Sequence, residues 1–260
     1  KRLAPRRLGL ALALQFPLSR PLDRSTAFRL RTFFSLLQHL ADRLGDRASY
    51  LYADVSREED LAKLIAAAVE HFGRIDCLFN NAGGRSRGTL ETVTKEDFDH
   101  AMHLLLGSVV FGMKHAAPVM KKQGSGSIIN TSSIAAIRSG QGGYLYSVAK
   151  AGLTHLTRLA GLELGPFGIR VNSISPGAIA TPIFWGGSEQ ANLLSTEENE
   201  RKMEKLKKNL SGATPLPRAG YAEDIAWAAL YLASDEGGFV NCQDIVVDGG
   251  RTAMFVEPSR

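Results

Sequence analysis

Two short apolar runs flank a long helical pattern in the second half of the chain, and they decide the fold. Residues 127–131 read Ser-Ile-Ile-Asn-Thr and residues 169–174 read Ile-Arg-Val-Asn-Ser-Ile, and each run is typical of a buried β-strand. Residues 144–164 between them have apolar side chains at helical spacing, and Gly165-Pro166 ends that pattern. A strand, a crossover helix and a second strand form a βαβ unit, whose two strands run parallel.

The same alternation continues toward both ends of the chain. We predict further strands at 50–55, 75–79 and 244–247, and further helices at 61–72, 94–120, 195–209 and 223–234. Strands separated by helices of this length indicate one parallel sheet in a single α/β domain. Such sheets bind ligands at the carboxyl ends of their strands, so we expect the chemistry in the residues that follow each strand.

Local signals mark where the first two of these helices begin and end. Ser56 precedes Glu59 by three residues, and Thr94 precedes Asp97 by the same spacing. This spacing is typical of a capping box, in which the first side chain accepts a hydrogen bond from the start of the helix. Gly73 is predicted to end the first helix.

The composition is that of a folded domain. Of the 260 residues, 44% are hydrophobic and 22% are charged, which excludes a disordered chain, a collagen-like fibre and a membrane channel. No run of about 18 apolar residues occurs, so we expect no transmembrane helix and no membrane partner. Cys77 and Cys242 cannot build a disulfide framework and fit a reducing compartment, so we expect a cytoplasmic protein.

The net charge of +5 is concentrated near the N-terminus. Residues 1–47 hold ten basic and three acidic residues, a net charge of +7, whereas residues 48–260 hold 21 and 23, a net charge of −2. No recognition motif accompanies the basic segment, so we expect no nucleic-acid partner. The histidines and cysteines lack the spacing of metal ligands, so we predict no metal site.

The strongest candidate for chemistry is a serine, a tyrosine and a lysine. Ser133 follows strand 127–131, Tyr146 stands thirteen residues further, and Lys150 lies four residues beyond Tyr146. Residues at i and i+4 share one face of a helix. An ammonium near a phenol favours the phenolate, so we expect a lowered pKa for Tyr146 and a role as general acid or base. Tyr144 has no lysine at that spacing.

Two loops at the ends of other strands could hold a ligand. Residues 80–83, Asn-Asn-Ala-Gly, follow strand 75–79, and their small side chains would let a ligand approach the backbone. Residues 175–177, Ser-Pro-Gly, force a turn after strand 169–174, which would turn Thr181 toward a ligand lying across the strand ends.

These motifs, in this order, resemble those of the short-chain dehydrogenase/reductase family, from about residue 48 to residue 252. The resemblance implies a Rossmann-like, doubly wound parallel sheet in one domain, with a catalytic region at 48–260. By this resemblance, residues 1–47 are an atypical basic segment in place of the first βαβ unit of the family, which is diverged or incomplete in this chain. The matching residues are Asp54, Val55, Asn80, Asn81, Ala82, Gly83, Ser133, Tyr146, Lys150, Pro176, Gly177, Ile179, Thr181, Asp248, Gly249 and Gly250.

The resemblance also implies an activity. The enzyme would transfer a hydride between NAD or NADP and a small or medium apolar secondary alcohol or ketone. Tyr146 would exchange the hydroxyl proton, Lys150 would lower the pKa of that tyrosine and hold the nicotinamide ribose, and Ser133 would bind the substrate oxygen. Cofactor contacts are implied for Asp54, Val55, Asn81, Ala82, Gly83, Tyr146, Lys150, Pro176, Gly177, Ile179 and Thr181.

Further implications concern the substrate and the assembly. Members of the family cover the substrate with the region that corresponds to 183–217 here, so Ile183, Phe184 and Trp185 are predicted to line an apolar pocket. Arg85 and Arg87 border it and could face an acidic substrate, although solvent exposure is the preferred interpretation. The resemblance also implies a homodimer or homotetramer.

One departure from the family lies in the helix predicted at 94–120. Leu105 stands where members usually have an asparagine that kinks the helix and holds a water in a proton relay. The leucine side chain cannot form a hydrogen bond, so proton transfer between Lys150 and solvent is expected to be slower. A catalytically impaired member, acting as an interaction or regulatory subunit, is therefore the alternative to an active enzyme.

The N-terminus departs further from the family. It shows no first strand, only Gly9 could replace one glycine of the usual Gly-rich turn, and residues 10–16 could form the helix that follows. Asp23 and Arg24 would select opposite cofactors, so NAD is kept as the default. A diverged βαβ unit, a targeting segment and an erroneous gene model are the three explanations.

Overall fold

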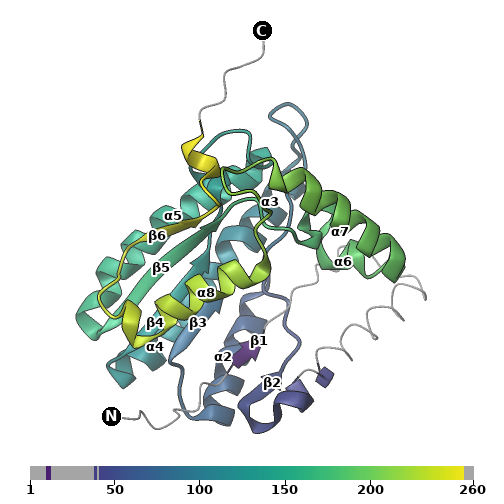
Figure 1. The fold of residues 1–260 in the computed structure, drawn as a ribbon. Coiled ribbons are helices and arrows are strands. Elements are labelled where there is room, and N and C mark those ends of the chain that lie inside the picture. The colour runs from purple at the N-terminus through teal and green to yellow at the C-terminus, as the bar shows by residue number, and fades with distance from the viewer. Residues whose placement is uncertain (1–9, 13–37, 40, 255–260) are drawn as a thin grey trace.

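The fold centres on a parallel β-sheet. The computed structural model describes residues 10–12, 38–39 and 41–254. Four strands pair in parallel in the order β3-β4-β5-β6 (Figure 1). Their bounds are Cys77–Asn80 for β3, Gly126–Thr131 for β4, Ile169–Pro176 for β5 and Asp244–Val247 for β6.

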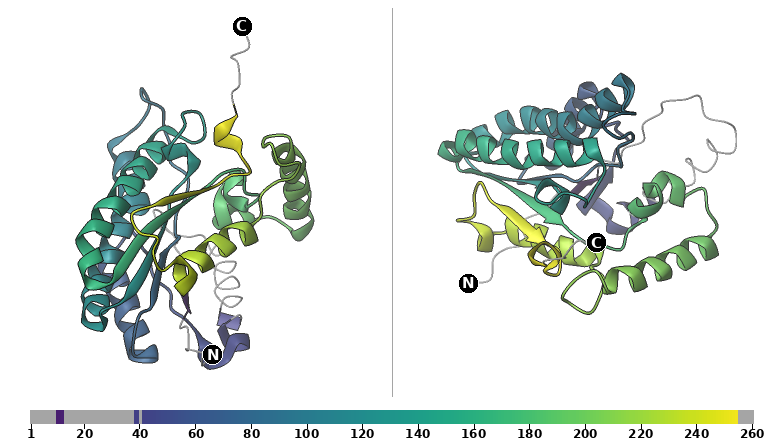
Figure 2. Two further views of the ribbon diagram at one scale, coloured as in Figure 1. Left: turned by 60° about the vertical axis from the view of Figure 1, so that its left-hand side comes forward. Right: turned by 90° about the horizontal axis from the view of Figure 1, so that it is seen from above.

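Helices cover both faces of this sheet. On one face α4 contacts β3 and β4 and α5 contacts β5, with α2 packed against α4, while α8 contacts three strands from the other face (Figure 2). Two further helices, α6 and α7, stand beside the sheet (Figure 1). The bounds are Glu58–Phe72 for α2, Lys95–Met102 for α3, Ser108–Gln123 for α4, Tyr144–Leu164 for α5, Gly187–Ala191 for α6, Thr196–Ser211 for α7 and Ala222–Ala233 for α8. The predicted Rossmann-like arrangement is confirmed.

The apolar run of β4 explains why both faces need cover. Ile128 is fully buried in one cluster with Leu153 of α5, and Ile129 is buried in another with Leu232 of α8. Successive side chains of a strand point to opposite faces of the sheet. A strand covered on both faces therefore buries its central side chains on either side, and in β4 these include the polar Ser127 and Asn130 as well as the two isoleucines.

The N-terminal part contains a second, smaller sheet. β1 (Leu10–Leu12) pairs in parallel with β2 (Ala48–Tyr50), with Leu10 opposite Ala48. The prediction that residues 10–16 form a helix is therefore wrong at residues 10–12, whereas the strand expected before Gly9 would lie outside the described residues. The strand predicted at 50–55 is also misplaced, because β2 ends at Tyr50 and residues 51–54 have no regular structure. Gly9, Asp23 and Arg24 lie outside the described residues.

The predicted helix caps differ in outcome. The hydroxyl of Thr94 accepts a hydrogen bond from the Asp97 amide at 3.1 Å, so the capping box of α3 is confirmed. The box at Ser56 is wrong, because its hydroxyl donates to the Asp54 carboxylate at 2.7 Å and α2 begins only after Arg57. Gly73 ends α2 with a φ of 78°, a left-handed conformation that glycine adopts without strain.

The described part of the chain contains neither a candidate membrane span nor a candidate cluster of metal ligands. No helix there is long and apolar enough to cross a membrane. Within the same residues, no three His, Cys, Asp or Glu side chains are grouped as metal ligands.

Candidate active site

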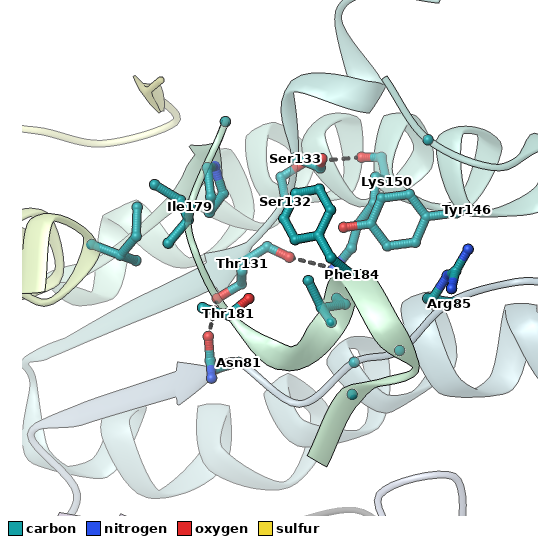
Figure 3. Close-up of a pocket in the computed structure, with 18 of the residues that line it drawn as sticks. Asn81, Arg85, Thr131, Ser132, Ser133, Tyr146, Lys150, Ile179, Thr181 and Phe184 are labelled. Carbon is teal, nitrogen blue, oxygen red and sulfur yellow. Dashed lines mark hydrogen bonds between the residues drawn. The ribbon is translucent and has the colours of Figure 1, made fainter. Parts of the chain in front are cut away.

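A cavity of about 830 Å³ opens at the carboxyl ends of the strands (Figure 3). Its walls come from the segments that follow β3, β4 and β5, together with α5 and the start of α8. Its volume lies in the range of small-molecule and cofactor sites. The predicted site residues that line it are Asn81, Gly83, Ser133, Tyr146, Lys150, Pro176, Gly177, Ile179, Thr181, Ile183 and Phe184.

Three residues predicted to contact the cofactor lie outside the cavity lining. Asp54 accepts hydrogen bonds from the amide and the hydroxyl of Ser56. Val55 is buried in an apolar cluster with Leu61, and Ala82 packs against that cluster. All three therefore support the loops around the site, and a contact with the cofactor stays a prediction.

Trp185 does not line the cavity, in contrast to its neighbours Ile183 and Phe184. The three residues belong to a short 3₁₀ helix, Pro182–Trp185. Successive side chains of such a helix point about 120° apart, since it has three residues per turn. Trp185 therefore turns away from the cavity, and its indole nitrogen is buried without a hydrogen-bond partner in the described residues.

Lys150 lies at the bottom of the cavity. It is 4% exposed, and its ammonium donates a hydrogen bond of 2.6 Å to the backbone carbonyl of Thr131, at the end of β4 (Figure 3). Burial disfavours the charged form and lowers the pKa of Lys150 to about 8. The lysine is thus held at the end of β4. Near pH 8 its charged and neutral forms are about equally populated.

Tyr146 differs from the sequence prediction in its acidity. Burial raises the pKa of its phenol above the usual 10.0, and hydrogen bonding with the Ser133 hydroxyl opposes that rise only in part. The expected lowering is therefore wrong for this structure. The reason is geometric, since the Lys150 ammonium lies 5.7 Å from the centroid of the tyrosine ring and is turned to the Thr131 carbonyl. The phenol of Tyr146 therefore stays protonated at neutral pH, because its pKa lies above the usual 10.0.

The two serines after β4 have different surroundings. The Ser132 hydroxyl is 2.6 Å from the hydroxyl of Thr154 and donates to the Lys150 carbonyl at 3.2 Å. The Ser133 hydroxyl accepts from the Ala135 amide and also interacts with Tyr146. Ser132 therefore fixes α5 to the strand end, while Ser133 accompanies the tyrosine.

A buried amide pair lies below the site. Asn80 donates to Asn130 at 2.8 Å, and Asn130 donates to the Thr157 hydroxyl of α5 at 3.0 Å. Asn81, the next residue, accepts from the Thr131 hydroxyl at 2.9 Å (Figure 3). Asn80 and Asn81 thus join the end of β3 to β4 at the edge where the cavity opens.

Leu105 occupies an irregular turn between α3 and α4. Residues 103–107 form a π-helical turn, so the single helix predicted at 94–120 is interrupted. Leu105 is 1% exposed there, and one of its methyl groups would lie 3.6 Å from a Cβ at Gly83. The helix is therefore irregular at this point without an asparagine, and Leu105 adds no polar group beside Lys150.

The C-terminal turn reaches the same cavity. Arg251 donates from Nε to Gln141, a lining residue, at 2.7 Å and from Nη1 to the Ala213 carbonyl at 2.9 Å. Arg138 donates to the carbonyls of Thr252 and Met254. Sequence reasoning missed these arginines, because the pairs are more than 100 residues apart and no spacing signal connects them.

The comparisons with known proteins agree with this geometry. The family profile described as enoyl-(acyl carrier protein) reductase matches residues 28–252. A solved short-chain type dehydrogenase/reductase from Mycobacterium ulcerans superposes with a TM-score of 0.72 at 29% identity, over 94% of this chain and 81% of that one. This chain belongs to the short-chain dehydrogenase/reductase family.

Two relatives within the short-chain dehydrogenase/reductase family have names that state an enzymatic activity. Momilactone A synthase of Oryza sativa subsp. japonica is 41% identical over 218 residues, which is 83% of this chain and 76% of that protein. Trans-4-hydroxycyclohexanecarboxylate dehydrogenase of Sinomonas cyclohexanicum is 36% identical over 208 residues, or 80% and 72% of the two chains. The chain is thus an oxidoreductase of this family.

Members of the short-chain dehydrogenase/reductase family use NAD or NADP, and the strand ends here fit the nicotinamide end of either. Tyr146, Lys150 and Thr181 supply hydroxyl and ammonium groups to the cavity. Gly177 packs closely against Asp248, because a Cβ there would lie 2.3 Å from the Asp248 side chain. Asp248 itself accepts from the Gly250 amide and so closes the turn beside it.

Proposed function

We propose that this chain interconverts a secondary alcohol and a ketone, of small to medium apolar character, with NAD or NADP as hydride carrier. The observation that carries the proposal is that Ser133, Tyr146 and Lys150 all line one cavity at the strand ends. Each has the position that the reaction requires, because the proton donor, its neighbouring cation and a second hydroxyl must face the same bound carbonyl.

The residues divide the work of ketone reduction. The cofactor supplies the hydride when bound. Burial raises the pKa of Tyr146, so its phenol is protonated at neutral pH before the reaction. It then donates this proton to the developing alkoxide oxygen. Ser133 donates a hydrogen bond to the same oxygen and stabilises its charge. Lys150, whose ammonium lies 5.7 Å from the centroid of the Tyr146 ring, would hold the ribose of the bound cofactor from the bottom of the cavity.

The walls favour a ring-shaped apolar substrate. Ile179, Ile183 and Phe184 give the cavity lining apolar side chains, and Figure 3 shows Ile179 and Phe184 among them. The name of the Sinomonas relative describes a hydroxyl group on a cyclohexane ring. Cyclohexanol and cyclohexanone are therefore the first substrates to test.

The decisive experiment has two steps. Titration of the protein with NADH and with NADPH, followed by nucleotide fluorescence, is expected to show micromolar binding, with NADH preferred. Reduction of cyclohexanone is then followed by loss of nucleotide absorbance. A folded protein that binds neither nucleotide would overturn the proposal and favour a catalytically impaired family member.

We also propose a homodimer or homotetramer in the cytoplasm. Two helices present apolar side chains to solvent: Val148, Leu159 and Leu162 on α5, and Trp227, Leu230 and Tyr231 on α8. Patches of this kind mark protein interfaces, which would cover them. Light scattering coupled to size exclusion is expected to give at least twice the chain mass of 28.1 kDa, and a monomer would contradict the proposal.

A further inference from the structure

The charges around the cavity are one-sided. Among the residues that line it, the charged side chains are Arg85 and Lys150, and the lining includes no Asp or Glu. The rest of the wall is apolar or neutral. The cavity lining therefore has no carboxylate that would repel an anionic ligand. Whether the cavity attracts such a ligand depends on whether Arg85 or Lys150 is free to bind it.

Lys150 is already committed. It is buried, and its ammonium donates to the Thr131 carbonyl. Arg85 is exposed, and no hydrogen bond or ion pair joins it to any residue of the described ranges. Arg85 is therefore the cation that can bind a group entering from solvent.

The loop that carries Arg85 is anchored beside the catalytic tyrosine. The next residue, Ser86, accepts a hydrogen bond from the Tyr146 amide at 2.9 Å. A Cβ at Gly143, which directly precedes α5, would lie 3.0 Å from that same hydroxyl oxygen, so the loop and the helix start are closely packed. Figure 3 shows Arg85 on the side of the cavity where Tyr146 and Phe184 lie. The backbone that carries Arg85 is thus held beside the start of α5.

We propose that Arg85 is a specificity-determining residue that binds a carboxylate on the substrate, so that the enzyme prefers an anionic ketone or alcohol to its neutral counterpart. This inference rests on the proposed function and names its substrate class. A guanidinium offers two parallel N–H donors to a carboxylate, which fixes orientation as well as adding attraction. The reacting carbonyl would face Tyr146 and Ser133 while the carboxylate stays at the opening.

Arg87 is the matched control. It lies two residues along the same loop, it is exposed as Arg85 is, and it is not among the lining residues. Arg85→Gln and Arg87→Gln therefore change the net charge and the loop composition equally. Only the first removes a cation from the cavity.

The test compares 4-oxocyclohexanecarboxylate with its methyl ester and with cyclohexanone. In the wild type, we expect kcat/KM for the acid to exceed that for the ester by about tenfold, the scale of one charge-assisted hydrogen bond. Arg85→Gln is expected to remove this preference, chiefly by raising KM for the acid. Arg87→Gln is expected to keep it. Calorimetric titration with cyclohexanecarboxylate and cyclohexanecarboxamide measures the same preference without turnover.

The outcomes separate this inference from the proposed function. Equal kcat/KM for acid and ester, or equal loss of preference in both variants, overturns the role of Arg85 and leaves the oxidoreductase standing. If none of the three ketones is reduced, the proposed function fails, and the calorimetric comparison then decides the role of Arg85. Carboxylate binding that weakens only in Arg85→Gln supports it, and the absence of such a difference overturns it.

Discussion

The floor of the cavity, formed by Thr131, Ser132 and Lys150, contrasts with its rim, formed by Arg85 and Phe184. The floor is largely buried, and its polar groups bond to one another across β4 and α5. At the rim Phe184 is 46% exposed, and Arg85 has no polar partner among the described residues. A floor substitution leaves buried groups without partners, whereas a rim substitution exchanges one solvated side chain for another. The chemistry is therefore tied to stability, and the selectivity is not.

The largest expected effect comes from Tyr146, the reactive group proposed to lie beside the floor. Tyr146→Phe removes the proton donor and is expected to lower kcat/KM by about 10³-fold, in the range of general acid catalysis. Tyr144→Phe is the control, because Tyr144 is 48% exposed and lies two residues earlier on α5. Ketone reduction by both variants measures the contrast. A similar loss in both variants would contradict the assignment of Tyr146.

The second prediction concerns Lys150 and pH. Its folded-state pKa of about 8 lies below the ordinary 10.5, so between these values the unfolded chain binds more protons. The free energy of unfolding should therefore rise from pH 8 to pH 10, relative to Lys150→Met, by about 2 to 3 kcal/mol. The variant should also lose activity, by about 10²-fold.

Comparison with the variant is needed because Cys77 acts in the opposite direction. Burial raises the pKa of its thiol to about 11, so the folded chain binds more protons above pH 9. Cys77 is present in both proteins, and its contribution cancels in the difference. Urea unfolding of both proteins at pH 7, 8, 9 and 10 provides the measurement. Parallel curves would show that burial of Lys150 does not set its charge.

The third prediction compares Ser132 of the floor with its neighbour Ser133. Ser133→Ala is expected to lower kcat/KM by about 10²-fold with little change in unfolding, as for one lost oxyanion donor. Ser132→Ala is expected to lower the free energy of unfolding by about 1 to 3 kcal/mol, because Thr154 loses its hydroxyl partner. Activity assays and urea unfolding of both variants separate the roles, and a reversed pattern would refute them.

The smallest expected effect concerns Leu105. Leu105→Asn places a polar group beside Lys150 and is expected to raise kcat by about twofold if proton transfer limits the rate. The buried amide should also reduce the free energy of unfolding, by about 1 to 3 kcal/mol. Leu104→Asn is the control, because Leu104 is equally buried but packs toward Gly84. An unchanged kcat in Leu105→Asn would exclude a rate-limiting relay.

Strong local patterns predicted the frame of this molecule. Helix α5 and strand β6 have the predicted bounds, 144–164 and 244–247. In α5 the apolar spacing is long and Gly165-Pro166 marks its end. Three residues, as in β1, are too few to distinguish a strand from a helix by periodicity. The bounds of a short strand depend on its partner, which lies far along the chain.

The errors at the site have a common physical cause. Ser56 failed as a cap because the Asp54 carboxylate captured its hydroxyl, a choice between two local partners. The acidity of Tyr146 was misjudged because its spacing from Lys150 says nothing about burial or about the competing Thr131 carbonyl. Local sequence thus placed the reacting groups, and their environment came from residues distant in the chain.

The link between Arg251 and Gln141 also bears on how the protein is made. Gln141 lies in the loop before α5, yet the arginine that holds it follows 110 residues later. During synthesis the segments up to β5 leave the ribosome before the turn at 251–253 is made. The nascent chain can therefore form most of its sheet while the loop that contains Gln141 still lacks its hydrogen bond from Arg251. A protein cut short by a few residues before Arg251 would leave the ribosome with its catalytic tyrosine in place and its pocket unfinished.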